Sequence, residues 1–279
     1  MKDLSNENVI HIVKDGVQYL QFRRLLEYSD ILVHAYSLGI DKNFRTARAK
    51  NVEPLTQEEV KKANKDYSDL CNAIEMNYID AVKPNQAHTK NVKKVDEHVN
   101  INKPDFNLKE YDFTDGLITN KSNILLATTN ADCILLMFFD PIKKAIANVH
   151  SGWKGTLQRI SVETVEKMQK EYGSNSKDII CCICPSIRKC HFEVEKDVQT
   201  LFENEFKDLK LDEIIERKSE NKWLIDTVKI NEEILQKAGL RKENIIDCGI
   251  CSVCNSDLIH SYRVEKEKYG LSTAIIGLK

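Results

Sequence analysis

Residues 133–150 read CILLMFFDPIKKAIANVH, two apolar runs separated by Asp140-Pro141. Each run has the length of a β-strand, and Asp-Pro is typical of a turn, so the stretch predicts an antiparallel hairpin. If the turn centres between Pro141 and Ile142, paired residues have numbers that sum to about 283. Cys133 then lies directly opposite His150, on the same face of the hairpin.

This pairing predicts a metal-binding or catalytic site. Directly opposed Cβ atoms lie roughly 4.5–5.5 Å apart, so a thiolate and an imidazole there can share a metal ion, and Zn²⁺ prefers these ligands. The same pair would also serve a hydrolase in which Cys133 is the nucleophile and His150 the base. His88, in the polar segment 84–90, is a third candidate, although its spacing is equally compatible with a hydrogen-bonded structural histidine.

Outward from the hairpin, the pattern alternates between strands and helices. Residues 9–37 predict an antiparallel meander, and the capping-box sequence at Thr56–Glu59 predicts a helix over 57–77. Apolar stripes over 157–172 and 230–238, each followed by glycine, predict two core-facing helices. Further strands are expected near 92–95, 124–129, 134–139, 144–149, 179–184, 222–226, 244–250 and 272–278, with a surface helix and loop over 203–222.

These elements predict an α/β fold, with mixed, largely antiparallel sheets flanked by helices, in a single domain over residues 1–279. The 42% hydrophobic content is sufficient for a core, and a net charge of -2 shows no bias toward nucleic acid or anionic membranes. The longest apolar run, Ile134–Phe139, is too short to span a bilayer, and no apolar stretch of signal-peptide length begins the chain. We therefore expect a cytoplasmic protein that acts on small molecules, while its oligomeric state is not determined by the sequence.

Residues 151–156, SGWKGT, follow His150 directly. Two glycines let the backbone approach a ligand, Thr156 can cap a following helix, and the helix N-terminus beside Lys154 would suit a phosphate or carboxylate. A strand-to-helix turn with a packed Trp153 explains the same residues. Arg188 and Arg263 are further candidates for binding an anion. The alternative for Arg188 is a surface arginine, and the alternative for Arg263 is a structural ion pair.

The nine cysteines are interpreted as free thiols or metal ligands rather than as a disulfide framework. Cys181 and Cys182 are consecutive in a predicted strand, so they face opposite ways and are expected to be buried thiols. Cys248, Cys251 and Cys254 form two successive C-x-x-C steps. That spacing can serve zinc or an iron–sulfur cluster, for instance in a module that recognises a partner, but Asp257 occupies the position of a fourth cysteine.

Several motifs together resemble the laccase-domain family, whose members were first described as multicopper polyphenol oxidases and later as zinc-dependent purine nucleoside phosphorylases. The resemblance covers about residues 30–279. The motifs are Thr129–Cys133, Asn148–Thr156, Gln86–His88, Asp115–Asn120, Pro185–Ile187, Cys190–Val194 and Ser261–Arg263.

The resemblance implies that His88, Cys133 and His150 hold zinc at a catalytic site. It implies phosphorolysis of adenosine, inosine, guanosine and methylthioadenosine, and deamination of adenosine. Phosphate held by Lys154, Arg188, Arg263 or backbone N–H groups would attack C1′ of the sugar, and Trp153 would stack on the purine or simply pack. The chain departs from the family pattern with Lys154 in place of arginine, Cys184 and Arg188 in place of glycines, and Val264 in place of a second arginine.

The oxidase description fits the sequence poorly. A multicopper oxidase needs several copper sites rich in imidazole, but the chain has only seven histidines and no His-x-His pair. Adventitious Cu²⁺ at the same three ligands would still permit weak polyphenol oxidation, because Cu²⁺ binds nitrogen and sulfur sites more tightly than Zn²⁺.

Overall fold

The structure, a computed structural model, describes residues 2–46, 55–77, 81–96 and 111–279. At its centre, β8 (Ile134–Asp140) and β9 (Ala145–Ser151) form the predicted antiparallel hairpin. Its register differs from the prediction, because Leu135 lies opposite His150 and paired numbers sum to 285. The Asp140 carboxylate accepts the backbone N–H groups of Ile142 (2.9 Å) and Lys143 (3.0 Å), which makes a longer turn than expected. The predicted pairing of Cys133 with His150 is therefore wrong by two residues, a shift that keeps both side chains on one face.

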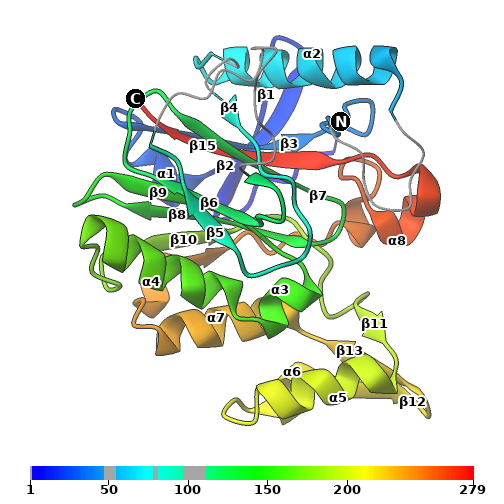
Figure 1. The fold of residues 1–279 in the computed structure, drawn as a ribbon. Helices are drawn as coiled ribbons and strands as arrows, with labels where there is room; N and C mark the ends of the chain where they lie inside the picture. Colours follow the sequence, from blue (N-terminus) through cyan, green and yellow to red (C-terminus); the bar gives the residue numbers. More distant parts are fainter. Residues whose placement is uncertain (1, 47–54, 78–80, 97–110) are drawn as a thin grey trace.

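Two six-stranded sheets and one three-stranded sheet form the framework (Figure 1). The first has the order β1-β2-β3-β15-β7-β4, the second β14-β10-β8-β9-β6-β5, and the small sheet β11-β13-β12. Among the strands of the described residues, all pairs are antiparallel except β4 with β7, β5 with β6 and β10 with β14. The remaining strands are β1 (Val9–Lys14), β2 (Val17–Phe22), β3 (Leu32–Leu38), β4 (Ala81–Val82), β5 (Val92–Lys94), β6 (Gly116–Thr119), β7 (Leu125–Asn130), β10 (Ile180–Ile183), β11 (Glu193–Val194), β12 (Ile215–Ser219), β13 (Lys222–Ile225), β14 (Ile245–Asp247) and β15 (Ser272–Leu278).

The two large sheets stack face to face, and helices cover their outer faces (Figure 1). The helix α2 (Gln57–Ala73) packs on the first sheet, while α4 (Ile160–Tyr172) and α7 (Thr227–Lys237) pack on the second. The other helical segments are α1 (Arg23–Leu26), α3 (Trp153–Leu157), α5 (Lys196–Glu205), α6 (Leu211–Ile214), α8 (Tyr262–Glu265), η3 (Lys242–Asn244), η4 (Val253–Asn255) and η5 (Lys266–Lys268). The mixed, largely antiparallel α/β class predicted from the sequence is confirmed.

Both faces of β8 are buried, which explains why its apolar run is continuous. Leu135, Met137 and Phe139 enter the core between the two sheets, whereas Leu136 and Phe138 face α4 and α7. A strand buried on both faces needs apolar side chains at every position, and each fully buried leucine or phenylalanine contributes about 1.5–3 kcal/mol to folding. Cys133 and His150 extend the row of Leu135, so they lie at the end of the space between the sheets.

The cysteines of β10 behave as predicted. Cys182 lies in the core between the large sheets and Cys181 in the core beneath the helices, so consecutive thiols face opposite ways. Both are fully buried free thiols. Burial raises the pKa of each thiol well above its usual range, which keeps both protonated and unreactive.

Two predicted elements differ from the structure. The apolar stripe over 157–172 is interrupted, because α3 ends at Leu157, Arg159 adopts a left-handed conformation (φ 56°), and α4 begins at Ile160. The segment 203–222, expected to be a surface helix and loop, includes the strand β12. Its sequence IERKS is charged and largely exposed, so it lacks the apolar alternation that identifies a half-buried strand.

Candidate metal centre and adjoining pocket

The structure brings His88, Cys133 and His150 together. His88 comes from the loop between β4 and β5, Cys133 immediately precedes β8, and His150 lies in β9. One ligand atom from each residue lies within 4.8 Å of the other two, and His88 Nε2 is 3.8 Å from Cys133 Sγ. The two imidazole rings meet edge to face, with their centres 4.9 Å apart.

Asp115 fixes the position of both histidines. Its buried carboxylate accepts a 2.8 Å hydrogen bond from Nδ1 of His150, which leaves Nε2 of that ring free to bind a ligand. The same carboxylate accepts the backbone N–H groups of Ala87, His88 and Thr89. Burial alone would raise the pKa of Asp115, but the bonds from His150 and Thr89 outweigh it and lower the pKa to about 2. The sequence analysis named Asp115 only within a motif of the family resemblance, and nothing in its local sequence revealed this role.

The loop that carries His88 is also held from its other side. The Gln86 side chain donates to the Thr129 carbonyl and accepts the Thr129 N–H, each at 2.8 Å. Its amide thus bonds to the β7 backbone as a neighbouring strand would. His88 itself adopts φ 60°, a left-handed conformation that costs free energy in a non-glycine residue. The bonds from Asp115 and Gln86 hold it there and aim its ring at Cys133.

Gly152 supplies the space for the His88 ring. It directly follows Ser151, the last residue of β9, which pairs with Ile134 next to Cys133. A Cβ atom at Gly152 would lie 2.7 Å from His88 Cδ2 and 3.2 Å from Cys133 Sγ. Only glycine fits without displacing a candidate ligand. The sequence pattern singled out this glycine as a close-approach residue but did not identify which side chain it accommodates.

The electrostatics of the cluster favour a bound cation. Burial alone would raise the pKa of Cys133, but the adjacent His150 and His88 rings outweigh it and lower the pKa of the thiol to about 6. Burial would lower the pKa of His150, but the Cys133 thiolate and the Asp115 carboxylate raise it to about 9. The Cys133 thiolate that a metal requires is therefore favoured at neutral pH, and a metal bound there would displace the proton from Nε2 of His150.

A pocket of about 770 Å³ opens beside the cluster, large enough for a nucleoside. His88, Cys133 and His150 line it, as do two of the four residues predicted to bind substrate, Trp153 and Arg263. The Arg263 guanidinium donates to the His191 carbonyl (2.9 Å) and lies 3.4 Å from that of Glu193. Other lining residues include Phe44, Arg45, Lys83, Asn85, Gln86, Phe192, Glu193, Asp197, Tyr262 and Tyr269.

The structure places the other two predicted substrate contacts away from the pocket lining. Lys154 is exposed, with Nζ 5.4 Å from the centre of the Trp153 ring. Arg188 forms a two-pronged ion pair with Asp247, with Nη1 2.6 Å from Oδ1. The predicted helix cap at Thr156 is wrong, since α3 begins after Gly152, and the Thr156 hydroxyl instead contacts Ser151 and Asn231 inside the core.

Two cationic residues of the pocket were missed by the sequence analysis. Arg45 has two buried nitrogens, Nε and Nη1, that find no hydrogen-bond partner among the described residues. Its guanidinium carbon lies 5.8 Å from the centre of the Tyr269 ring. Lys83 lies over the Tyr67 ring, and burial lowers the pKa of its ammonium group to about 7. Neither residue belongs to a motif, so no local signal could have identified it.

None of the helices in the described ranges is both long and apolar enough to cross a membrane.

Comparison with known proteins identifies the family. Residues 43–279 match the family described as "Multi-copper polyphenol oxidoreductase laccase". Over 166 residues the chain is 33% identical to "Purine nucleoside phosphorylase YlmD" of Bacillus subtilis, a match covering 60% of this chain and 59% of that protein. Over 175 residues it is 31% identical to the human "Purine nucleoside phosphorylase LACC1", covering 61% of this chain and 40% of that protein. The match thus spans less than two thirds of either relative.

The fold is shared with solved structures. The Bacillus licheniformis hypothetical protein YfiH superimposes with a TM-score of 0.81 at 23% identity, covering 95% of this chain and 100% of that one. YlmD from Geobacillus stearothermophilus superimposes with a TM-score of 0.81 at 20% identity, covering 97% of this chain and 99% of that one. On the family match, which extends over most of its length, this chain belongs to the multi-copper polyphenol oxidoreductase laccase family.

Proposed function

We propose that the chain is a zinc-dependent purine nucleoside phosphorylase that also deaminates adenosine. The observation that carries the proposal is the His88–Cys133–His150 cluster, which faces a nucleoside-sized pocket that also contains cationic side chains. The names of the relatives from Bacillus subtilis and human support the phosphorylase part of this proposal.

The residues of the cluster fit zinc. Two imidazoles and one thiolate match its preferred donors, and three protein ligands leave a fourth position for substrate or water, as in catalytic sites. The Asp115–His150 bond is the outer contact that commonly orients a zinc-bound histidine. Zinc held by these three residues would supply a Lewis acid that polarises a substrate oxygen or activates water.

The rest of the pocket accounts for the substrates. Arg263 and Arg45 provide guanidinium groups for phosphate, and the two unpartnered nitrogens of Arg45 are donors without an acceptor among the described residues. The aromatic side chains of Trp153, Tyr262 and Tyr269 offer faces for a purine ring. Lys83, with its pKa near 7, exchanges a proton readily at neutral pH.

Incubation of the zinc-loaded protein with adenosine, with and without phosphate, tests the proposal. Separation of adenine, inosine and hypoxanthine by chromatography distinguishes the two activities. Adenine formed only with phosphate indicates phosphorolysis, and inosine formed in either buffer indicates deamination. Absence of turnover of every purine nucleoside, in a protein that carries zinc at Cys133, would overturn the proposal.

A second function is favoured by one observation: Cys133 is an ionised thiol beside a protonated imidazole, as in cysteine hydrolases. The two functions differ in whether they require His88. Replacement His88→Ala abolishes activity if the site binds zinc, whereas a Cys133–His150 couple retains activity without His88 and after removal of the metal by a chelator. Measurement of turnover in these two samples decides between them.

A further inference from the structure

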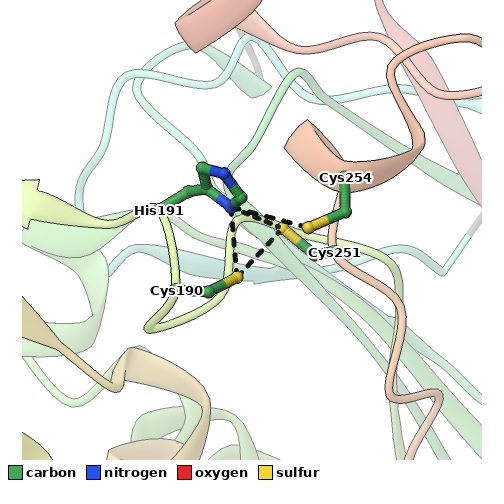
Figure 2. A group of neighbouring side chains, drawn as sticks. All are labelled: Cys190, His191, Cys251 and Cys254. Carbon is green, nitrogen blue, oxygen red and sulfur yellow. Dashed lines mark hydrogen bonds between the residues drawn. The ribbon is translucent and has the colours of Figure 1, made fainter.

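A second cluster of ligating side chains lies away from the three residues of the proposed zinc centre. Cys190 and His191 come from the loop between β10 and β11, and Cys251 and Cys254 come from the segment that follows β14 and includes η4. Their four ligating atoms all lie within 4.8 Å of one another. Figure 2 shows the three sulfur atoms gathered around Nδ1 of His191.

The distances match those around one tetrahedral metal ion. His191 Nδ1 lies 3.1 Å from Cys190 Sγ, 3.7 Å from Cys251 Sγ and 3.6 Å from Cys254 Sγ, and the sulfurs of Cys190 and Cys251 are 3.7 Å apart. Zinc with bonds of about 2.3 Å to sulfur and 2.0–2.1 Å to nitrogen separates its ligands by about 3.8 Å (sulfur to sulfur) and about 3.5 Å (sulfur to nitrogen). A disulfide would need sulfurs about 2.05 Å apart, and all four cysteine and histidine groups are instead arranged around a common centre.

We propose that Cys190, His191, Cys251 and Cys254 bind a structural zinc ion. Three thiolates and one imidazole form a complete tetrahedral shell, and a site with four protein ligands has no open position for substrate. The site therefore differs in kind from the cluster of His88, Cys133 and His150, where three ligands leave a position open.

The local backbone explains how adjacent residues and a C-x-x-C pair converge. The N–H of His191 bonds to the Arg188 carbonyl at 2.9 Å, a turn that directs the Cys190 and His191 side chains toward the same point. Cys251 and Cys254 are separated by two residues, the spacing with which zinc sites commonly begin. The Asn255 side chain donates to the Cys251 carbonyl at 2.8 Å and closes this turn.

Cys248 is excluded from the site, although the sequence spacing includes it. Its side chain lies in the core between the sheets with 1% of its surface exposed, and its sulfur accepts the Ile250 N–H. The expected run of three cysteine ligands is therefore replaced by two of its members together with Cys190 and His191. Cys248 supplies a matched control, because it is a cysteine at the same C-x-x-C spacing from Cys251 but does not reach the proposed metal.

The position of the site connects it to the pocket. The carbonyl of His191 holds the Arg263 guanidinium, and Ser252, next to Cys251, donates to the Asp132 carboxylate at 2.6 Å. The other oxygen of Asp132 accepts the Arg263 N–H at 2.7 Å. A zinc ion would thus join the two loops that position Arg263. This link to substrate binding rests on the proposed function, whereas the zinc site itself does not.

Zinc content, measured by mass spectrometry on protein purified from zinc-supplemented cells, tests the proposal independently of activity. We expect two zinc ions per chain in the natural protein, one in Cys254→Ala, one in Cys133→Ala and none in the double variant. The control Cys248→Ala keeps two. The proposal is overturned if the natural protein holds one zinc ion that Cys254→Ala does not remove, or if Cys254→Ala retains both.

A second measurement identifies the ligands. In the Cys133→Ala background, cobalt in place of zinc should show strong thiolate-to-cobalt charge-transfer bands, because this site contributes three thiolates. The bands should disappear in Cys133→Ala/Cys254→Ala and return, weaker because two thiolates remain, in Cys133→Ala/Cys254→His, since histidine is also a zinc ligand. Circular dichroism checks that each variant folds. Acid-labile sulfide with visible absorption, or a mass lower by two hydrogens from a disulfide at these cysteines, would contradict the proposal.

Discussion

The Asp115 carboxylate lies 2.8 Å from Nδ1 of His150 and at the same time accepts the backbone N–H of His88 at 3.0 Å. One side chain therefore orients two candidate ligands that are far apart in the sequence. Because both bonds end on the same carboxylate, a change at Asp115 must displace the imidazole of His150 and the loop of His88 together.

We expect Asp115→Asn to weaken zinc binding at this centre by about tenfold to a hundredfold. Asparagine has one acceptor oxygen in place of two, and its NH₂ group would face N–H donors of Ala87, His88 and Thr89 that now bond to the carboxylate. Competition against a chelating dye measures the affinity, in a Cys254→Ala background that removes the proposed structural zinc. Asp112→Asn is the control, since that carboxylate contacts the Asn85 side chain and lies outside the cluster. Equal affinities in the two variants would refute the role of Asp115.

Gly152→Ala should disable the metal centre while leaving the fold intact. Gly152 has φ -62°, which alanine adopts readily, so its effect is steric and comes from the contacts of the new methyl group with His88 and Cys133. A ligand displaced by about 1 Å typically costs about a hundredfold in activity. Nucleoside turnover and zinc content measure the loss.

The matched control is Gly155→Ala in the same short helix. Its methyl group would meet the Cγ2 methyl of Ile160 at 3.3 Å, a contact relieved by a shift of a few tenths of an ångström, and would lie at ordinary contact distances of 3.5 and 3.6 Å from the carbonyl oxygens of Thr89 and His150. We expect this variant to retain zinc and activity. If Gly152→Ala retained both as well, the space beside His88 would not be required for the site.

The hairpin shows what the sequence could predict and where the prediction ended. Two continuous apolar runs and the Asp-Pro turn between them identified both strands, because each strand is buried on both sides, and the side-chain period of two put Cys133 and His150 on a common face. The register was missed because it depends on the Asp140 side chain, which lengthens the turn through two backbone bonds. His88 could be joined to the site only through family resemblance, since the groups that place its loop, the Asp115 carboxylate and the Thr129 backbone that Gln86 binds, are distant from it in the chain.

The anion-binding residues were less predictable for a physical reason. The sequence does not show whether a lysine or arginine is exposed, ion-paired or without a partner. Only the fold shows that Arg188 is neutralised by Asp247, while two nitrogens of Arg45 lack a partner among the described residues. The same limitation affected the cysteines, since the C-x-x-C-x-x-C spacing included Cys248 but could not reveal Cys190 and His191 as neighbours of Cys251 and Cys254.

Arg45→Ala should raise the KM for phosphate by about tenfold to a hundredfold, because a hydrogen bond to a charged group contributes about 1.5–3 kcal/mol. The control Arg188→Ala should leave this KM unchanged and lower the melting temperature instead, since it leaves the Asp247 carboxylate without its ion pair. Steady-state phosphorolysis at varied phosphate measures the difference. An unchanged KM in Arg45→Ala would show that this guanidinium does not bind phosphate.

His34 should make the fold sensitive to acid. It lies 1% exposed in β3, where its Nε2 accepts the Phe22 N–H at 2.7 Å, and burial lowers its pKa from 6.5 to about 3. Below pH 6.5 the unfolded chain binds a proton that the folded chain does not, so the stability that neutral His34 provides is present above pH 6.5 and is lost as the pH falls toward 3. At pH 5 this loss amounts to about 2 kcal/mol.

Urea unfolding of the natural protein and of His34→Gln isolates this contribution, because the glutamine amide oxygen can accept the same bond and does not titrate. Metal loss and carboxylate titration affect both proteins alike, so the difference between their unfolding free energies should shift by about 2 kcal/mol, against the natural protein, between pH 7 and pH 5. A constant difference would show that His34 is protonated within the folded core.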